Sequence, residues 1–170
     1  MSVLEFIEHC HTGLNADWIM MCGPSCVGKS HFMNTHGLYF AKKAIGGKNI
    51  YIPLRDKHFK HLGIHHHWAL TSDPNEWPED WLELYNTKNF TINKKAIVIG
   101  IPYSIWLKRG EMRGFCPRES ARLTSVETFV QSYKKIFKKL KNNKIPHISV
   151  DSRDDYPILD ELSFIKMLKE

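Results

Sequence analysis

Gly23-Pro24-Ser25-Cys26-Val27-Gly28-Lys29-Ser30 is the stretch of this sequence that decides the fold, because it has the spacing Gly-x-x-x-x-Gly-Lys-Ser. A short apolar run at residues 18–22 precedes it, and a segment that suits a helix follows. A buried strand that passes through a glycine-rich loop into a helix lets successive backbone amides surround phosphate oxygens. The stretch therefore predicts a phosphate-binding loop. A chance match is the weaker interpretation, since motif and context agree.

The loop residues have separate expected tasks. Gly23 and Gly28 permit backbone conformations and a close approach that a side chain would block. Lys29 is expected to act as a catalytic residue that bridges the β- and γ-phosphates of a nucleoside triphosphate, and the Ser30 hydroxyl to ligate the accompanying Mg²⁺. Cys26 is either a redox-sensitive thiol or a small residue that fits the loop. ATP and Mg²⁺ are thus the predicted cofactors, and all eight loop residues are predicted to form the cofactor site.

Size and composition favour one globular domain, residues 1–170. The chain has 42% hydrophobic and 25% charged residues, within the range of a single domain with its own core. Its formal net charge of +6 favours anionic partners such as nucleotides, phosphorylated substrates or nucleic acid. Four cysteines are too few for a disulfide scaffold, and no signal peptide or apolar stretch of roughly 18 residues is present. We therefore expect a cytoplasmic protein without a membrane segment.

Apolar runs alternate with helical periodicity along the chain. Strands are predicted at residues 18–22, 49–54, 96–101 and 145–150, with residues 64–70 as a further candidate. Helices are predicted at residues 30–43, 78–85 and 124–142, and after Pro102. Strands that alternate with helices predict an α/β fold, a three-layer P-loop NTPase domain with a mainly parallel sheet of about five strands.

A group of basic residues follows the strand at residues 96–101: Lys108, Arg109, Arg113, Arg118 and Arg122. Arg109 and Arg113 are four residues apart, so they share one face of the helix predicted after Pro102. Phosphoryl transfer depends on neutralising the charge that spreads over the transferring oxygens, and arginines that close over the site can supply this. The alternative interpretation is a basic helix whose charges are simply solvated.

Residues 18–30, residues 96–113 and residues 124–151 together resemble the layout of small P-loop kinases: nucleoside monophosphate kinases, shikimate-type kinases and the kinase domains of polynucleotide kinases. The resemblance covers most of the chain in layout, and the phosphate loop is its sharpest motif. It implies that Arg109 and Arg113 are catalytic lid residues. It also implies that the loop after the last strand, with Arg153, surrounds the nucleoside base. Asp56, which follows the second strand, is then the general base towards the acceptor hydroxyl, with Arg55 beside the substrate.

Two points of this resemblance leave alternatives. From the residues alone, Asp56 fits equally well as the cap of a helix that begins near Lys57. In such kinases another strand commonly ends in an acidic residue that holds Mg²⁺ through water. Here histidines at positions 65–67 occupy that place, and Asp73 is the nearest acidic substitute. The acidic partner of the metal is therefore not fixed by the sequence.

Histidines cluster before and within the candidate strand: His58, His61, His65, His66 and His67. They are interpreted as a zinc site, as the lining or local base of the acceptor site, or as polar loop residues. Nearby tryptophans either stack on a base or sugar of the acceptor or pack in the core: Trp68, Trp77 and Trp81. The helix at residues 124–142 and the turn after it carry lysines opposite the apolar stripe: Lys134, Lys135, Lys138, Lys139, Lys141 and Lys144. These lysines either track a nucleic-acid backbone or form a solvated face.

The sequence thus favours an ATP-dependent phosphotransferase, a P-loop kinase that moves the γ-phosphate to a hydroxyl acceptor. A nucleoside, a nucleotide or a nucleic-acid component is the expected acceptor, and the sequence leaves the oligomeric state open. Two other classes are compatible with the loop: a nucleic-acid-stimulated P-loop ATPase and a nucleotide-dependent switch. A guanine-specific switch would use an Asn/Thr-Lys-x-Asp segment, which the sequence lacks.

Overall fold

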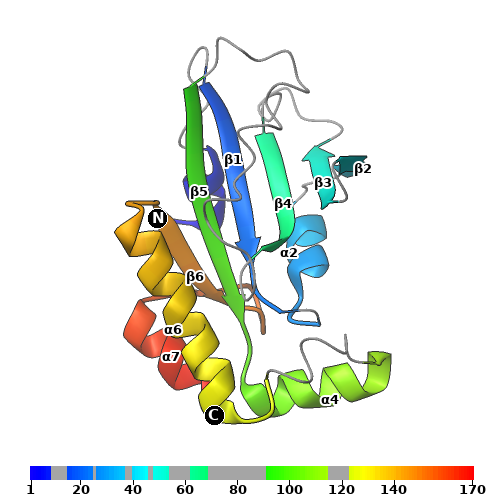
Figure 1. The fold of residues 1–170 in the computed structure, drawn as a ribbon, viewed down its shortest axis with the longest axis vertical. Coiled ribbons are helices and arrows are strands. Elements are labelled where there is room, and N and C mark those ends of the chain that lie inside the picture. Colours follow the sequence, from blue (N-terminus) through cyan, green and yellow to red (C-terminus); the bar gives the residue numbers. More distant parts are fainter. Residues whose placement is uncertain are drawn as a thin grey trace.

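One β-sheet forms the centre of the protein in its computed structural model (Figure 1). The structure describes residues 1–8, 15–24, 26–36, 40–45, 48–53, 62–68, 91–114 and 123–170. The strands are β1 (Asn15–Cys22), β2 (Phe40–Ile45), β3 (Lys48–Pro53), β4 (Leu62–Trp68), β5 (Thr91–Gly100), β6 (His147–Asp151) and β7 (Ile158–Leu159). The helices are α1 (Val3–Glu8), α2 (Lys29–Thr35), α4 (Tyr103–Arg113), α6 (Val126–Asn142) and α7 (Glu161–Leu168).

The middle of the sheet is parallel. Its strand order is β2-β3-β4-β1-β5-β6-β7, and β4, β1, β5 and β6 run in parallel, whereas β2, β3 and β7 join as antiparallel strands. The predicted α/β class with a mainly parallel sheet is confirmed for these central strands, and residues 62–68 form the further strand. The predicted count of about five strands was low, because the described part of the chain contributes seven.

The helix after the loop is shorter than the sequence predicts. The prediction of a helix over residues 30–43 was wrong beyond Thr35, because α2 ends at Thr35 and β2 begins at Phe40. β2 pairs antiparallel with β3, with Lys42 opposite Tyr51. The two strands are separated in sequence only by Gly46 and Gly47, the residue type that two-residue hairpins favour. Pairing with β3 thus overrides the helix propensity of the Ala and Lys residues in this segment.

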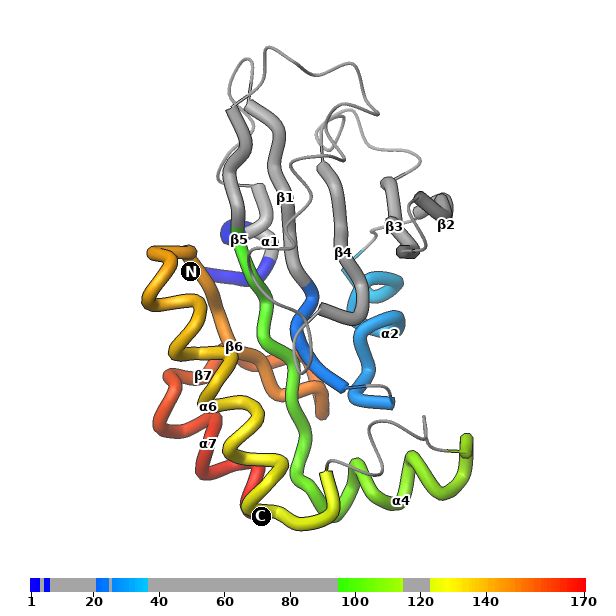
Figure 2. The backbone as a smooth tube through the Cα atoms, in the orientation of Figure 1, coloured from blue at the N-terminus to red at the C-terminus, as the bar shows by residue number. Residues whose placement is uncertain are grey.

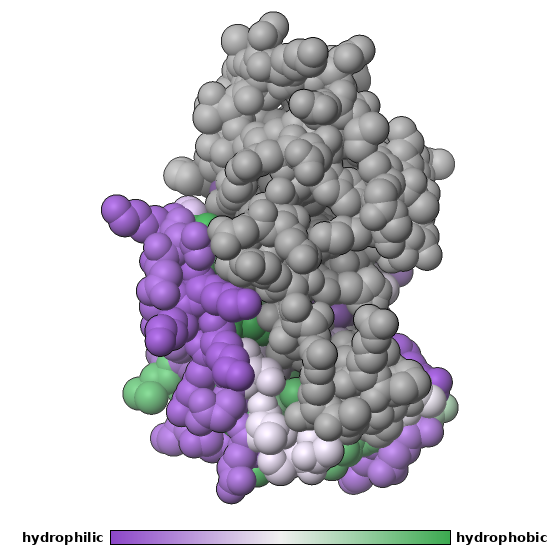
Figure 3. Space-filling view, viewed as in Figure 1, coloured by the Kyte–Doolittle hydropathy of each residue, from purple (hydrophilic) through white to green (hydrophobic). Residues whose placement is uncertain are grey.

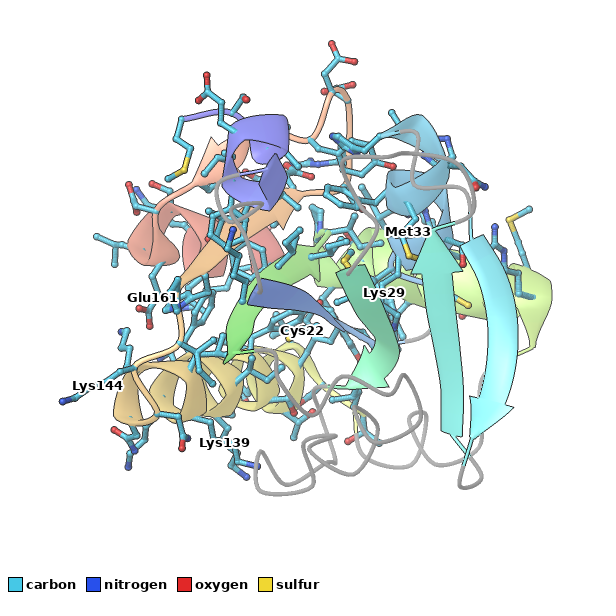
Figure 4. All side chains as sticks on the ribbon, turned by 90° about the horizontal axis from the view of Figure 1, so that it is seen from above. Cys22, Lys29, Met33, Lys139, Lys144 and Glu161 are labelled. Atoms are coloured by element: carbon cyan, nitrogen blue, oxygen red, sulfur yellow. The ribbon has the colours of Figure 1, made fainter. Side chains whose placement is uncertain are left out.

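Helices lie on both faces of the sheet. Helix α6 lies on one face, and α1 and α2 lie on the other (Figure 1, Figure 4). The predicted periodic stripe of α6 is buried: Phe129, Val130, Tyr133, Ile136, Phe137 and Leu140. Its first turn is closed by a capping box in which Ser125 and Thr128 bond reciprocally, a device that contributes about 1 kcal/mol. The predicted helix over residues 124–142 is therefore confirmed.

Aromatic packing fixes where α4 runs. Trp106 is fully buried, and its ring lies 5.1 Å from that of Phe129 on α6 and 5.9 Å from that of Tyr103. The Tyr103 hydroxyl also donates a hydrogen bond of 3.0 Å to the Leu123 carbonyl. Since α4 follows the carboxyl end of β5, this anchor directs the helix past the loop between β1 and α2 (Figure 2). The helix predicted after Pro102 is thus confirmed, and its position brings its polar face to that loop.

Candidate functional site

The first glycine of the loop is required by packing. A Cβ atom at Gly23 would lie 2.8 Å from the Ile99 carbonyl oxygen and 2.9 Å from Cγ1 of Val27. The Ile99 oxygen is held in place, because it accepts a hydrogen bond of 2.6 Å from the buried hydroxyl of Tyr133. A side chain at position 23 would therefore displace backbone rather than a flexible group. The loop begins at a point that only glycine fits, between β1 and β5.

The second glycine is required by its backbone conformation. Gly28 caps α2 with φ +108° and ψ +19°, in the left-handed region that L side chains rarely adopt. A Cβ atom at this position would lie 3.4 Å from Cβ of Ser152 and 3.8 Å from Nη1 of Arg109. Cys26 also has a positive φ of 67°, which is uncommon for a residue with a side chain. The loop is thus tightly turned, and Gly28 sits at the meeting point of three segments.

Lys29 lies inside this turn. Its side chain is almost completely buried, and Figure 4 shows it in the interior of the molecule together with Cys22. Its Nζ donates hydrogen bonds to the carbonyl oxygens of Gly23 and Pro24, the latter at 2.9 Å. The ammonium group therefore holds the first two residues of the loop around itself. A charged group buried with such partners gives the loop a fixed positive centre.

A pocket of about 570 Å³ opens beside the loop. The described residues that line it are Pro24, Cys26, Gly28, Lys29, Ser30, His31, Arg109, Met112, Arg113, Ser152 and Tyr156. Lys29, Arg109 and Arg113 are the charged residues in this lining, and none of the described lining residues is acidic. A concave site with converging cations and no opposing carboxylate favours an anionic ligand.

Helix α4 supplies the arginines through its spacing. Trp106 and Gly110 are buried, whereas Arg109, Met112 and Arg113 stand at positions i, i+3 and i+4 on the side that lines the pocket. The prediction that the two arginines share one helix face, close to the loop, is confirmed. The structure therefore brings together Arg109, Arg113 and most of the predicted loop residues.

The loop after β6 forms the other wall, which the sequence did not predict in this detail. Tyr156 is buried, with φ +52°, and packs edge to face on Phe32 of α2 at 5.0 Å. Its hydroxyl forms a hydrogen bond with Nδ1 of His31. Burial raises the pKa of Tyr156, while a hydrogen bond from Thr35 and the charge of Arg109 oppose that rise. The phenol is thus a neutral hydrogen-bonding group that ties this wall to α2.

Arg153 lies apart from the pocket lining. Its guanidinium pairs with the carboxylate of Asp151 at 2.7 Å and with that of Glu170 at 3.0 Å. The hydrogen bonds with Asp151 are the main reason that the pKa of Arg153 is raised further, with Glu170 adding to the effect. These pairs stabilise the turn after β6. A contact between Arg153 and a nucleoside base stays a prediction.

Several predicted residues lie outside the described residues. These are Ser25, Arg55, Asp56, His58, His61, Asp73, Trp77, Arg118, Arg122 and the helix at residues 78–85 with Trp81, together with the side chains of His65, His66, His67 and Trp68. Among the described residues no group of three His, Cys, Asp or Glu side chains could hold a metal ion. Ser30 is exposed and lines the pocket, so it is placed to ligate a metal that arrives with a phosphate ligand.

Sequence reasoning missed Ser152, Tyr156, His31 and Met112 as pocket residues. The signal for the first two was the position of their loop directly after β6, next to the strand that leads to α4. His31 directly follows the loop motif, and Met112 stands next to Arg113. The resemblance placed the loop after the last strand at the nucleotide but named only Arg153 in it, and no residue type indicated a binding role for His31 or Met112.

The comparisons with protein families and curated proteins assign no family to this chain. A scan against models of protein families finds no match, and a search of curated proteins finds no significant match. Within the described part of the chain, none of the helices has both the length and the apolar character needed to cross a membrane.

Proposed function

We propose that this protein is an ATP-dependent phosphotransferase that moves the γ-phosphate to a hydroxyl acceptor. One observation carries the proposal: Lys29 inside the loop and the arginines of α4 line the same pocket, and no described lining residue is acidic. A triphosphate is the ligand whose charge matches three convergent cations around a glycine-rich turn. The strand that ends before Pro102 and leads into an arginine-bearing helix is also the layout expected of small P-loop kinases.

Each lining residue has a role in this proposal. The loop amides and Lys29 hold the β- and γ-phosphates, and Arg109 and Arg113 neutralise the charge that develops on the transferring oxygens. Ser30 is the residue that would hold Mg²⁺ with the nucleotide. The metal, when bound, neutralises charge on the β- and γ-phosphate oxygens. Asp56 keeps its expected role as the base that accepts the proton of the acceptor hydroxyl.

The position of the arginines favours a phosphotransferase over a regulatory switch. Arg109 already lies against the loop, with Nη1 3.8 Å from the Cβ position of Gly28. The chain therefore carries its own charge-neutralising groups next to the proposed phosphate site. A slow switch that waits for a partner's arginine would not need them.

A second candidate function follows from α6. Its exposed side carries Lys134, Lys135 and Lys138, which form no ion pair with any described residue, whereas Lys141 pairs with Glu161. Hydrophilic residues cover the outer side of this helix in the space-filling view (Figure 3), and in Figure 4 Lys139 lies on its outer side and Lys144 just past its end. Lysines in such a row suit the backbone of a nucleic acid. Nucleic acid is then either the acceptor or the activator of a P-loop ATPase.

The test of the proposed function is transfer of labelled γ-phosphate from ATP with Mg²⁺. The acceptor panel contains nucleosides, nucleotides, 5′-hydroxyl oligonucleotides and small hydroxylated metabolites. Label that appears in one acceptor class supports the phosphotransferase and names its substrate. Release of free phosphate alone, increased by DNA or RNA, would instead favour the ATPase.

A further inference from the structure

Ser152 has a buried hydroxyl that is not used by the fold. The residue follows β6, and its backbone amide donates a hydrogen bond of 2.8 Å to the Gly100 carbonyl. Its Oγ is shielded from solvent and has no hydrogen-bond partner among the described residues. Among the described buried side-chain atoms it alone is in this state. The backbone of Ser152 is therefore fixed, while its side chain has nothing to bond with in the ligand-free protein.

A hydroxyl without a partner is unfavourable when it is buried. Transfer of a hydroxyl group out of water costs free energy unless a hydrogen bond replaces the one that water supplied. A methyl group of similar size would avoid this cost at the same position. An orphaned polar atom therefore calls for a partner that the ligand-free protein lacks.

The surroundings of Ser152 indicate what that partner is. Ser152 lines the pocket, and its Oγ lies 3.5 Å from the Cβ position of Gly28. Nη1 of Arg109 lies 3.8 Å from the same position. The hydroxyl therefore stands beside the phosphate loop and an arginine, in a lining whose described members include no carboxylate. A serine hydroxyl can turn between staggered rotamers about its Cα–Cβ bond, so it can be redirected into the pocket without backbone movement.

We propose that Ser152 is a ligand-binding residue whose hydroxyl donates a hydrogen bond to a phosphate oxygen of the bound polyphosphate. This inference rests on the proposed function, because it requires the pocket to bind a triphosphate. It adds a third wall to the phosphate site: the loop and α4 supply the charges, and the turn after β6 supplies a neutral donor. A donor to a charged oxygen forms one of the stronger kinds of hydrogen bond in proteins.

The variant Ser152→Ala separates a ligand-binding hydroxyl from a structural one. If the hydroxyl waits for a ligand, its removal leaves the urea midpoint of the ligand-free protein unchanged or higher, since an unpartnered polar atom disappears. The same change weakens binding of Mg²⁺-ATP and of inorganic tripolyphosphate, each by roughly tenfold or more, as expected for a hydrogen bond to a charged group. Urea unfolding and titration calorimetry measure the two effects.

Ser149→Ala is the matched control. Ser149 lies three positions earlier on β6, and its hydroxyl donates a hydrogen bond of 2.6 Å to the Leu159 carbonyl. Its removal breaks an existing bond, so we expect a lower urea midpoint and unchanged binding of tripolyphosphate. Ser152→Ala should thus lose binding and keep its stability, whereas Ser149→Ala should lose stability and keep its binding.

The outcomes are distinguishable. Equal tripolyphosphate binding by the wild-type protein and Ser152→Ala would overturn the role of Ser152 and leave the proposed function intact. A lower urea midpoint of Ser152→Ala would also overturn it, because the hydroxyl would then be structural. Weaker binding of ATP with unchanged binding of tripolyphosphate would place the contact on the nucleoside and contradict the phosphate contact. No binding of either ligand by the wild-type protein would remove the proposed function and this inference together.

Discussion

Nη1 of Arg109 lies 3.8 Å from the point where a Cβ atom would project from Gly28. The two residues come from distant parts of the chain, one from α4 and one from the loop before α2. The arginine is therefore placed against the loop before any ligand binds. Donors and charges that are already in position need no reorganisation when charge develops on a ligand, which is the main advantage of such a site.

Gly28→Ala should impair the loop beyond its cost in stability. The φ of +108° strains any L residue, and the new Cβ would lie 3.4 Å from Ser152. We expect a loss of about 1–3 kcal/mol in the free energy of unfolding and a large loss of ATP binding. Gly114→Ala is the control, because Gly114 has a φ of +74° with nothing within 4 Å of its Cβ position. If both variants bind ATP equally well, the loop geometry at Gly28 has no role in binding.

Arg109→Ala should slow phosphate transfer without unfolding the protein. The guanidinium lines the pocket while α4 is anchored through Trp106, so its removal takes away charge but not the helix. We expect a fall in kcat/KM of roughly 100-fold or more. Lys108→Ala is the matched control, since Lys108 is exposed and is not among the lining residues. An equal fall in both variants would show that only the overall charge of α4 matters.

Lys29→Ala should abolish transfer and also destabilise the loop. The Nζ of Lys29 is bonded to the carbonyl oxygens of Gly23 and Pro24, so the loop loses two hydrogen bonds with the side chain. We expect a cost of about 1–3 kcal/mol in unfolding free energy. Lys95→Ala is the control. Lys95 is also buried and donates a hydrogen bond of 2.7 Å to the Phe6 carbonyl, but it is not among the residues that line the pocket. It should lose stability and keep ATP binding. Transfer that survives in Lys29→Ala would contradict the proposed mechanism.

Two cysteines near the loop should differ in reactivity. Burial raises the pKa of Cys22 well above its usual value, and the charge of Lys29 only partly offsets this. At a given pH the thiolate fraction of Cys22 is thus reduced, so it should resist alkylation until the protein unfolds. Cys26 is half-exposed and lines the pocket. It should react with iodoacetamide, and Mg²⁺-ATP should protect it, as peptide mapping by mass spectrometry can measure. An unchanged rate at Cys26 with ATP present would place the nucleotide elsewhere.

The lysines of α6 allow a charge-matched test of nucleic-acid binding. We expect the double variant Lys134→Gln/Lys138→Gln to bind single-stranded oligonucleotides more weakly, with a salt-dependence slope that is shallower by about 0.7 for each phosphate that is no longer neutralised. The control Lys166→Gln/Lys169→Gln removes the same charge from exposed positions in and just after α7. If the lysines of α6 bind nucleic acid, the α6 variant should lose more oligonucleotide affinity than the control variant. Equal effects would mean that net charge alone attracts the oligonucleotide.

Most of the correct predictions came from patterns of residues that are close together in the sequence. The strand, loop and helix around Gly28 were predictable because a short apolar run, two glycines and a Lys-Ser pair are contiguous in sequence. The helix after Pro102 and the spacing of Arg109 and Arg113 were predictable for the same reason, since residues four apart share a helix face. The six buried positions of α6 follow a strict 3.6-residue period.

Features that depend on strand pairing or on unusual backbone conformations were not predictable. The strand at residues 40–45 forms because β3 lies beside it, which a window of Ala and Lys residues cannot indicate. The wall after β6 depends on positive φ values at Asp154 and Tyr156 and on the contact of Tyr156 with α2. A positive φ is uncommon for any residue other than glycine, and a tyrosine such as Tyr156 gives no sequence signal for it. The site was therefore predictable on the loop and α4 sides. On the β6 side the resemblance implied the loop after the strand but named Arg153, whereas Ser152 and Tyr156 line the pocket.

The central claim is that the pocket between the loop, α4 and the turn after β6 binds a nucleoside triphosphate. The most direct measurement is a calorimetric titration of the wild-type protein with Mg²⁺-ATP, repeated with Arg109→Ala and Lys108→Ala. We predict one bound ATP per chain for the wild-type protein and for Lys108→Ala, and clearly weaker binding for Arg109→Ala. Absence of ATP binding by the wild-type protein, or equal affinity of all three proteins, would contradict the account.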